Sequence, residues 1–190
     1  MLTGLYFGSF NPIHIGHLAV ANYMLEFTDL DEIWFVVSPQ TPLKKKHSLL
    51  NDQFRLKMVK LAMSQDPRFS VSDVEFEMPK PSYTSDTLTH LSKHHPDRQF
   101  VLVMGADGLS TFPGWKKFEF IQDKYTRYVY PRFEDDIETY KEQKNIKFVQ
   151  APKMEISSSF IRDGIKSGKD IRHFLPSKVY DFIQTKGFYL

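Results

Sequence analysis

Short runs of purely apolar residues that alternate with helical patterns are the feature of this chain that most constrains its fold. Residues 33–37 (IWFVV) and 100–104 (FVLVM) contain no polar side chain, which is typical of strands covered on both faces of a sheet. Further strands are predicted at 2–7, 69–74, 125–130 and 146–149, and helices at 16–26, 51–63, 84–94, 158–166 and 177–185. The alternation predicts an α/β fold, a Rossmann-like doubly wound, mostly parallel sheet with helices on both faces.

Length and composition limit the organisation and the partners. The 190 residues show no internal repeat and no linker, so a single domain over 1–190 is expected. A net charge of +2 does not favour a nucleic-acid partner, and the absence of cysteine excludes thiolate catalysis and cysteine-ligated zinc. No signal-peptide pattern and no long apolar run is seen, so we expect a cytoplasmic protein without membrane contact.

Three loops rich in small and polar residues each follow a predicted strand. They are 8–17 (GSFNPIHIGH), 38–46 (SPQTPLKKK) and 105–115 (GADGLSTFPGW). In an open parallel sheet, ligands bind beyond the carboxyl ends of the strands, near the point where the strand order reverses. We therefore expect these loops to gather at one edge and to form the functional site there.

The first loop places two histidines around a glycine at the start of a helix. His14 and His17 are three positions apart, so both side chains can face one ligand, and Gly8 and Ser9 allow a phosphate to approach the backbone closely. No carboxylate or third histidine lies nearby in sequence, which disfavours a zinc site. Phosphate contact is the favoured interpretation, and capping or packing by the histidines is the alternative.

A second candidate anion site lies far along the chain, in 156–162 (ISSSFIR). The hydroxyls of Ser157, Ser158 and Ser159 begin a predicted helix, whose first N–H groups favour an anion. Arg162 follows one turn later, where its guanidinium can bind phosphate oxygens in a fork. The alternative is a serine-capped helix with a solvated arginine.

These stretches resemble known signatures. GSFNPIHIGH resembles the G-x-[FY]-[DN]-P-x-H-x-G-H signature of the nucleotidyltransferase superfamily, and ISSSFIR resembles its I-S-S-T-x-I-R motif. Residues 81–88 (PSYTSDTL), the segment from Gly105 to Trp115 and the C-terminal 174–180 (FLPSKVY) resemble segments of bacterial nicotinate mononucleotide adenylyltransferases. The resemblance runs in the same order over nearly the whole chain.

The resemblance implies an enzyme of NAD biosynthesis. The expected reaction transfers AMP from ATP to nicotinate mononucleotide, giving deamido-NAD and pyrophosphate, by direct in-line attack without a covalent enzyme intermediate. Mg²⁺ is expected to arrive with ATP rather than in a protein-built metal site. The expected partners are these two small-molecule substrates, and the oligomeric state is not predicted.

The resemblance also implies roles for particular residues. The catalytic residues would be His14, His17 and Arg162. The ATP site would comprise Gly8, Ser9, Phe10, His14, Gly16, His17, Lys44, Ile156, Ser157, Ser158, Ser159 and Arg162. The mononucleotide site would comprise Ser9, Lys44, Tyr83, Thr84, Asp107 and Trp115. Trp115, expected in an exposed loop, would stack on the pyridine ring, and N–H groups of 83–85 would bind its carboxylate. Asp107 is expected to bind a ribose hydroxyl, to cap a helix, or both.

Further expectations concern positions outside these two sites. Arg55 is expected to be a surface charge on the second helix, whose buried face would hold Phe54 and Met58. The remaining histidines (47, 90, 94, 95 and 173) are expected to be surface or packing residues. Leu43 and Asn11 stand where relatives often carry histidine and aspartate. The alternative functions are adenylyl transfer to nicotinamide mononucleotide or phosphopantetheine, and a nucleotide-binding sensor without turnover.

Overall fold

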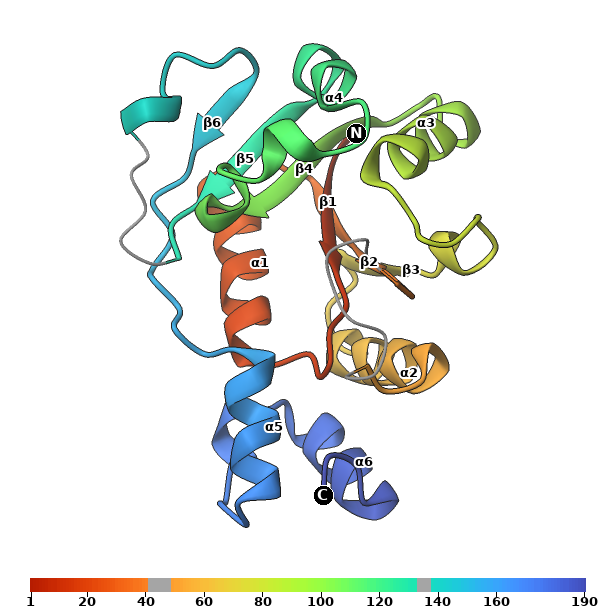
Figure 1. Ribbon diagram of the computed structural model, residues 1–190, viewed down its shortest axis with the longest axis vertical. Helices are drawn as coiled ribbons and strands as arrows, with labels where there is room; N and C mark the ends of the chain where they lie inside the picture. The colour runs from red at the N-terminus through yellow and green to blue at the C-terminus, as the bar shows by residue number, and fades with distance from the viewer. Residues whose placement is uncertain (41–48, 133–137) are drawn as a thin grey trace.

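Six parallel strands form one sheet in the order β3-β2-β1-β4-β5-β6. The computed structural model describes residues 1–40, 49–132 and 138–190 (Figure 1). The strands are β1 (Leu2–Gly8), β2 (Glu32–Val37), β3 (Phe69–Ser72), β4 (Gln99–Gly105), β5 (Thr126–Tyr130) and β6 (Ile146–Phe148). The helices are α1 (Ile15–Phe27), α2 (Asp52–Met63), α3 (Thr84–His94), α4 (Phe118–Lys124), α5 (Ser158–Lys166) and α6 (Ser177–Lys186).

The strand order reverses between β1 and β4, which lie side by side at the centre of the sheet. This is the doubly wound arrangement, and the predicted fold class is confirmed. The reversal leaves a crevice beyond the carboxyl ends of β1 and β4, where the loops after these two strands begin. The sequence pattern missed α4, because its seven residues are too short to show a clear helical period.

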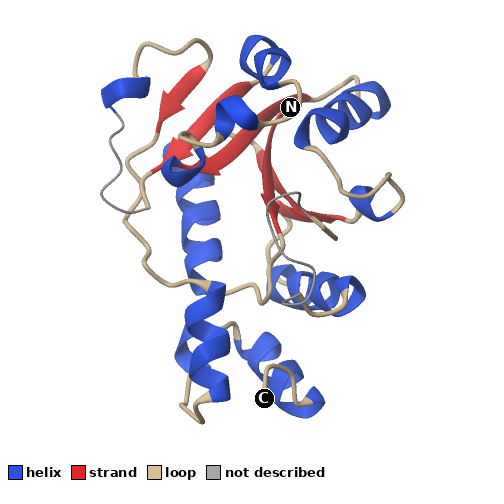
Figure 2. Cartoon of the chain, viewed as in Figure 1, coloured by secondary structure: helices blue, strands red, loops and turns tan. Residues whose placement is uncertain are grey.

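Side chains of the sheet alternate between two apolar layers. Tyr6 and Phe35 face the layer that contains α1 and α2, whereas their neighbours Leu5 and Val36 face the layer that contains α3 and α4. Because successive strand residues point to opposite faces, a strand buried on both sides must be apolar throughout, as 33–37 is. Figure 2 shows the helices on both sides of the sheet.

The buried face of α2 differs from the prediction. Phe54 is 39% exposed, and Arg55, which we expected on the surface, is 1% exposed. Met58 is buried, as the pattern predicted. The prediction for Arg55 was wrong because a guanidinium can be buried where main-chain carbonyls accept its hydrogen bonds, and those carbonyls lie on other loops.

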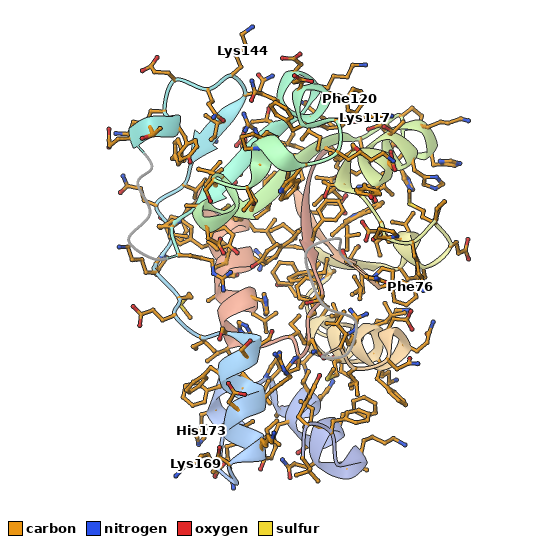
Figure 3. The ribbon with its side chains drawn as sticks, viewed as in Figure 1. Phe76, Lys117, Phe120, Lys144, Lys169 and His173 are labelled. Carbon is orange, nitrogen blue, oxygen red and sulfur yellow. The ribbon has the colours of Figure 1, made fainter. Side chains whose placement is uncertain are left out.

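Helices α5 and α6 lie together beyond the carboxyl ends of the strands, next to the start of α1 (Figure 1). Figure 3 shows His173 and Lys169 at the end of the molecule formed by these helices, away from the sheet. His173 is exposed, as predicted. Among the described residues, no helix combines the length and the apolar character that crossing a membrane requires.

Candidate active site

The loop after β1 begins with a close approach between Gly8 and Phe10. A Cβ atom on Gly8 would lie 2.7 Å from the Phe10 ring, so a larger residue would displace this ring. Phe10 itself has a positive φ of 43° and is buried. The Ser38 N–H donates to the Gly8 carbonyl at 2.9 Å, which ties this loop to the end of β2.

The rings of the two histidines of the loop contact each other at the start of α1, with an angle of 33° between their planes. Their ring centroids are 3.7 Å apart, and the His14 N–H donates to His17 Nδ1 at 3.2 Å. Because Nδ1 of His17 accepts this bond, the neutral ring carries its proton on Nε2, which is then the donor available to a ligand. A Cβ on Gly16 would lie 3.0 Å from His14 Nδ1, so glycine leaves room for the two rings.

His14 is neutral at physiological pH. Burial, and next the positive charge of Arg132, lower the pKa of His14 to about 3. Its Nδ1 is buried and makes no hydrogen bond to a described residue. As a neutral imidazole, His14 has one N–H donor and one acceptor nitrogen, and it does not bring a positive charge to the site.

The start of α5 is attached to the same loop. Ser157 caps the helix by accepting the Phe160 N–H at 3.1 Å. Ser158 Oγ donates to the Pro12 carbonyl at 2.8 Å, and Arg162 donates through Nη1 to the Asn11 carbonyl at 2.8 Å and through Nη2 to Ser159 Oγ at 3.2 Å. Two segments about 150 residues apart thus form one surface.

These segments enclose a cavity of about 510 Å³. Its lining includes every predicted ATP-site residue that the structure describes: Gly8, Ser9, Phe10, His14, Gly16, His17, Ile156, Ser157, Ser158, Ser159 and Arg162. Lys44 lies outside the described residues. The described lining holds no carboxylate, and the described residues contain no group of three or more His, Asp or Glu side chains placed to hold a metal ion. The arrangement presents hydrogen-bond donors and a guanidinium, which suits phosphate.

A second cavity of about 370 Å³ adjoins the first. Tyr83, Thr84 and Trp115, three of the residues expected to bind the mononucleotide, line this cavity, and Ser9 lines both cavities. Asp107 is absent from both described linings, and its carboxylate pairs with Arg132 at 3.0 Å. Its predicted ribose contact stays a prediction.

Trp115 lies in a mostly exposed loop, as expected, but its own side chain is half-buried. Its ring is partly buried and packs against Phe112, with ring centroids 5.5 Å apart. Phe112 is 1% exposed and packs in the core, whereas Pro113, Gly114, Lys116 and Lys117 are exposed.

Residues that the sequence did not single out complete the two cavities. Arg132, just after β5, lines the first cavity, and its position beyond a strand end could have indicated this. Glu75 and Lys116 line the second. Glu75 is 2% exposed and accepts hydrogen bonds from Ser82 at 2.6 Å and Thr87 at 2.8 Å. No local pattern around Glu75 distinguishes it from a surface glutamate.

Comparison with known proteins agrees with this geometry. The model of the cytidylyltransferase-like family matches residues 5–164. A protein of Flavobacterium johnsoniae is 50% identical over 100% of this chain and 99% of its own length, and one of Cytophaga hutchinsonii is 48% identical over 100% and 98%. Both carry the name "probable nicotinate-nucleotide adenylyltransferase".

Solved structures share the fold. The nicotinic acid mononucleotide adenylyltransferase of Plasmodium falciparum in complex with NaAD has a TM-score of 0.85 at 22% identity, covering 99% of this chain and 97% of that one. The same enzyme in complex with APC has a TM-score of 0.82 at 22% identity, covering 99% and 96%. The resemblance inferred from the motifs is confirmed: the chain belongs to the nicotinate-nucleotide adenylyltransferase family, within the cytidylyltransferase-like nucleotidyltransferases.

Proposed function

We propose that this chain transfers the adenylyl group of ATP to nicotinate mononucleotide, giving deamido-NAD and pyrophosphate. The observation that carries the proposal is the pair of adjoining cavities that share Phe7, Gly8 and Ser9. ATP occupies the cavity lined by the histidines and α5, and the mononucleotide occupies the cavity lined by Tyr83 and Trp115. The two phosphates then meet beside the loop after β1.

The chemistry needs no protein nucleophile. A phosphate oxygen of the mononucleotide attacks the α-phosphorus of ATP, and pyrophosphate leaves on the opposite side. The protein contributes orientation and stabilisation of the developing negative charge. His17 Nε2–H and the Arg162 guanidinium are the proposed donors, and neutral His14 supplies a further hydrogen bond. Mg²⁺ enters as part of the MgATP substrate, held by phosphate oxygens and water.

The start of α3 suits the carboxylate of the nicotinate ring. The first N–H that bonds within this helix belongs to Asp86, which donates to the Tyr83 carbonyl at 3.0 Å. The N–H groups of Thr84 and Ser85 therefore precede the intrahelical ladder and are suited to an anion. Lys116 also lines this cavity, where its ammonium contacts the Tyr83 ring at 4.5 Å and pairs with the Asp86 carboxylate at 2.8 Å.

The first test compares the acid and amide substrates. Purified protein is given MgATP with either nicotinate or nicotinamide mononucleotide, and pyrophosphate release is measured. We expect a higher kcat/KM for the acid, because the N–H groups at the start of α3 favour a negative charge. Equal values, or a preference for the amide, would contradict the assigned substrate. ATP binding without turnover on any mononucleotide would favour a sensor instead.

The second test concerns His17. His17→Ala removes the Nε2–H donor, and we expect kcat to fall by about 10²–10³, the usual cost of losing one donor to a developing charge. The fold should persist, because His17 lies at the partly exposed start of α1. The exposed histidine variant His173→Ala serves as the control. Wild-type turnover by His17→Ala would show that the assigned role is wrong.

A further inference from the structure

Arg55, near the start of α2, is a buried arginine that none of the roles described above involves. Its guanidinium donates to four main-chain carbonyls. Nε donates to Leu50 at 2.9 Å, Nη1 donates to Ser9 at 2.6 Å and to Ser38 at 2.8 Å, and Nη2 donates to Pro39 at 3.0 Å. A planar guanidinium with five N–H donors in fixed directions suits such a set of acceptors, whereas a lysine ammonium does not reproduce it.

The four carbonyls come from three separate segments. Ser9 follows β1, Ser38 and Pro39 follow β2, and Leu50 precedes α2. Ser9 lines both cavities and Ser38 lines the second. Figure 1 shows α2 beside the loop that leads from β1 to α1, which agrees with these bonds. Arg55 therefore joins the walls of the two cavities from behind, at the place where they meet.

The bond to Ser9 also orients a neighbouring donor. A trans peptide is planar, so the N–H of Phe10 points away from the Ser9 carbonyl and hence away from Arg55. Phe10 lines the first cavity, and its N–H makes no hydrogen bond to another described residue. Fixing the carbonyl towards Arg55 thus keeps this N–H directed to the opposite side of the loop, where a phosphate oxygen can accept it.

The charge of Arg55 is not paired with a nearby acid among the described residues. All its hydrogen-bond acceptors are neutral carbonyls, and the carboxylate of Asp52 pairs instead with Lys80 at 3.4 Å. Burial lowers the pKa of Arg55, and the more distant charge of Asp52 opposes this effect. Arginine nevertheless stays protonated in proteins, so a positive charge persists beneath the wall of an anion site.

We propose that Arg55 is a positioning residue for adenylyl transfer: it holds the Ser9 and Ser38 carbonyls, and with them the junction of the two cavities, in the geometry that brings the two phosphates together. This inference rests on the proposed function. We call these four hydrogen bonds of Arg55 the clamp. If Arg55 had only a general structural role, its loss would lower stability; loss of the clamp should instead misorient bound substrates and lower kcat more than it weakens substrate binding.

The main test compares Arg55→Met with Met58→Ala. Both change buried residues of α2, but Met58 belongs to the apolar core and its side chain has no hydrogen-bond donor for the loop carbonyls. At a temperature where circular dichroism shows both variants folded, Arg55→Met should lose about 10² in kcat, the cost of misplacing reacting groups. Its KM for MgATP should change much less. Met58→Ala should keep a kcat near that of the wild type.

Chemical rescue distinguishes a loss of the guanidinium hydrogen bonds from a loss of folding stability. Arg55→Ala leaves a space that ethylguanidinium can enter, and we expect this ion to restore kcat in a saturable manner, whereas propylammonium should not. If Arg55→Ala does not fold, Arg55→Lys keeps the charge and much of the volume without the planar fork. Its loss of kcat should lie between those of Met58→Ala and Arg55→Met.

Three outcomes would overturn the proposal. They are a kcat of Arg55→Met equal to that of Met58→Ala, a fully active Arg55→Lys, and a folded, inactive Arg55→Ala that ethylguanidinium does not rescue. The wild-type protein assayed in parallel identifies failure of the proposed function itself, because it would then show no turnover of nicotinate mononucleotide at all.

Discussion

At the scale of a single residue, burial determines the charge of the His14 imidazole. The sequence places His14 and His17 in one motif, but the structure gives them different environments. His14 is 4% exposed and its ring contacts the ring of His17, which is partly exposed. With its pKa lowered to about 3, chiefly by burial, His14 remains uncharged, whereas Arg162 and Arg132 bring positive charge to the described lining of the cavity.

The same shift predicts a pH dependence of stability. The folded-state pKa of about 3 lies below the ordinary value of 6.5, so between these values the unfolded chain binds a proton at His14 that the folded chain does not. The free energy of unfolding therefore decreases as pH falls below about 6.5, at up to about 1.4 kcal/mol per pH unit from this group. Above pH 6.5 the contribution is constant.

Urea unfolding of the wild type and of His14→Asn from pH 7 to pH 4.5 measures this effect. We expect the wild type to lose stability more steeply than the variant as pH falls, since asparagine does not titrate. His173→Asn, at an exposed position, should follow the wild-type curve. Parallel curves for the wild type and His14→Asn would contradict the assigned environment of His14.

At the scale of secondary-structure elements, the buried carboxylate of Glu75 holds the start of α3 in place. Glu75 lies in the short 3₁₀ helix Val74–Phe76, and its two oxygens accept hydrogen bonds from Ser82, just before α3, and from Thr87, in its first turn. The N–H groups proposed to bind the nicotinate carboxylate lie between these two residues. The geometry of that subsite therefore depends on a side chain from a preceding element.

Glu75→Leu should impair binding of nicotinate mononucleotide, while it lowers the free energy of unfolding only slightly. Both hydroxyls keep longer bonds to carbonyls, Ser82 to Gln40 at 3.3 Å and Thr87 to Tyr83 at 3.3 Å, so we expect a loss of about 1 kcal/mol in unfolding free energy. The KM for nicotinate mononucleotide should rise while the KM for MgATP changes little. Glu77→Leu, at a neighbouring exposed position, is the control. If the KM for nicotinate mononucleotide is unchanged in Glu75→Leu, Glu75 does not hold the nicotinate subsite in place.

At the scale of the whole molecule, the C-terminal segment reaches the loop after β1. The Tyr189 hydroxyl donates to Asn11 Oδ1 at 2.9 Å, and the Leu50 N–H donates to the same oxygen at 3.2 Å. Arg162 holds the Asn11 main chain, as described above. Asn11, where relatives often carry aspartate, thus acts here through a neutral oxygen that accepts hydrogen bonds from the C-terminus and from the segment before α2.

The sequence by itself determined that a sheet buried on both faces forms and which loops carry the anion-binding residues. Fully apolar runs require burial on both faces, and serines followed by an arginine indicate the start of an anion-binding helix; both signals are contained within a few neighbouring residues. For this reason the fold class, the bounds of α3 and α5 and the grouping of the two phosphate motifs could be predicted.

Only the tertiary structure decided how buried polar groups are satisfied. Arg55 is a buried clamp rather than a surface charge, His14 is neutral, and Asp107 pairs with Arg132, because the partners that set these states come from loops distant in sequence. A guanidinium, an imidazole and a carboxylate each look the same in sequence whether they are solvated or buried. Their role depends on which acceptors and charges the fold brings within hydrogen-bond distance.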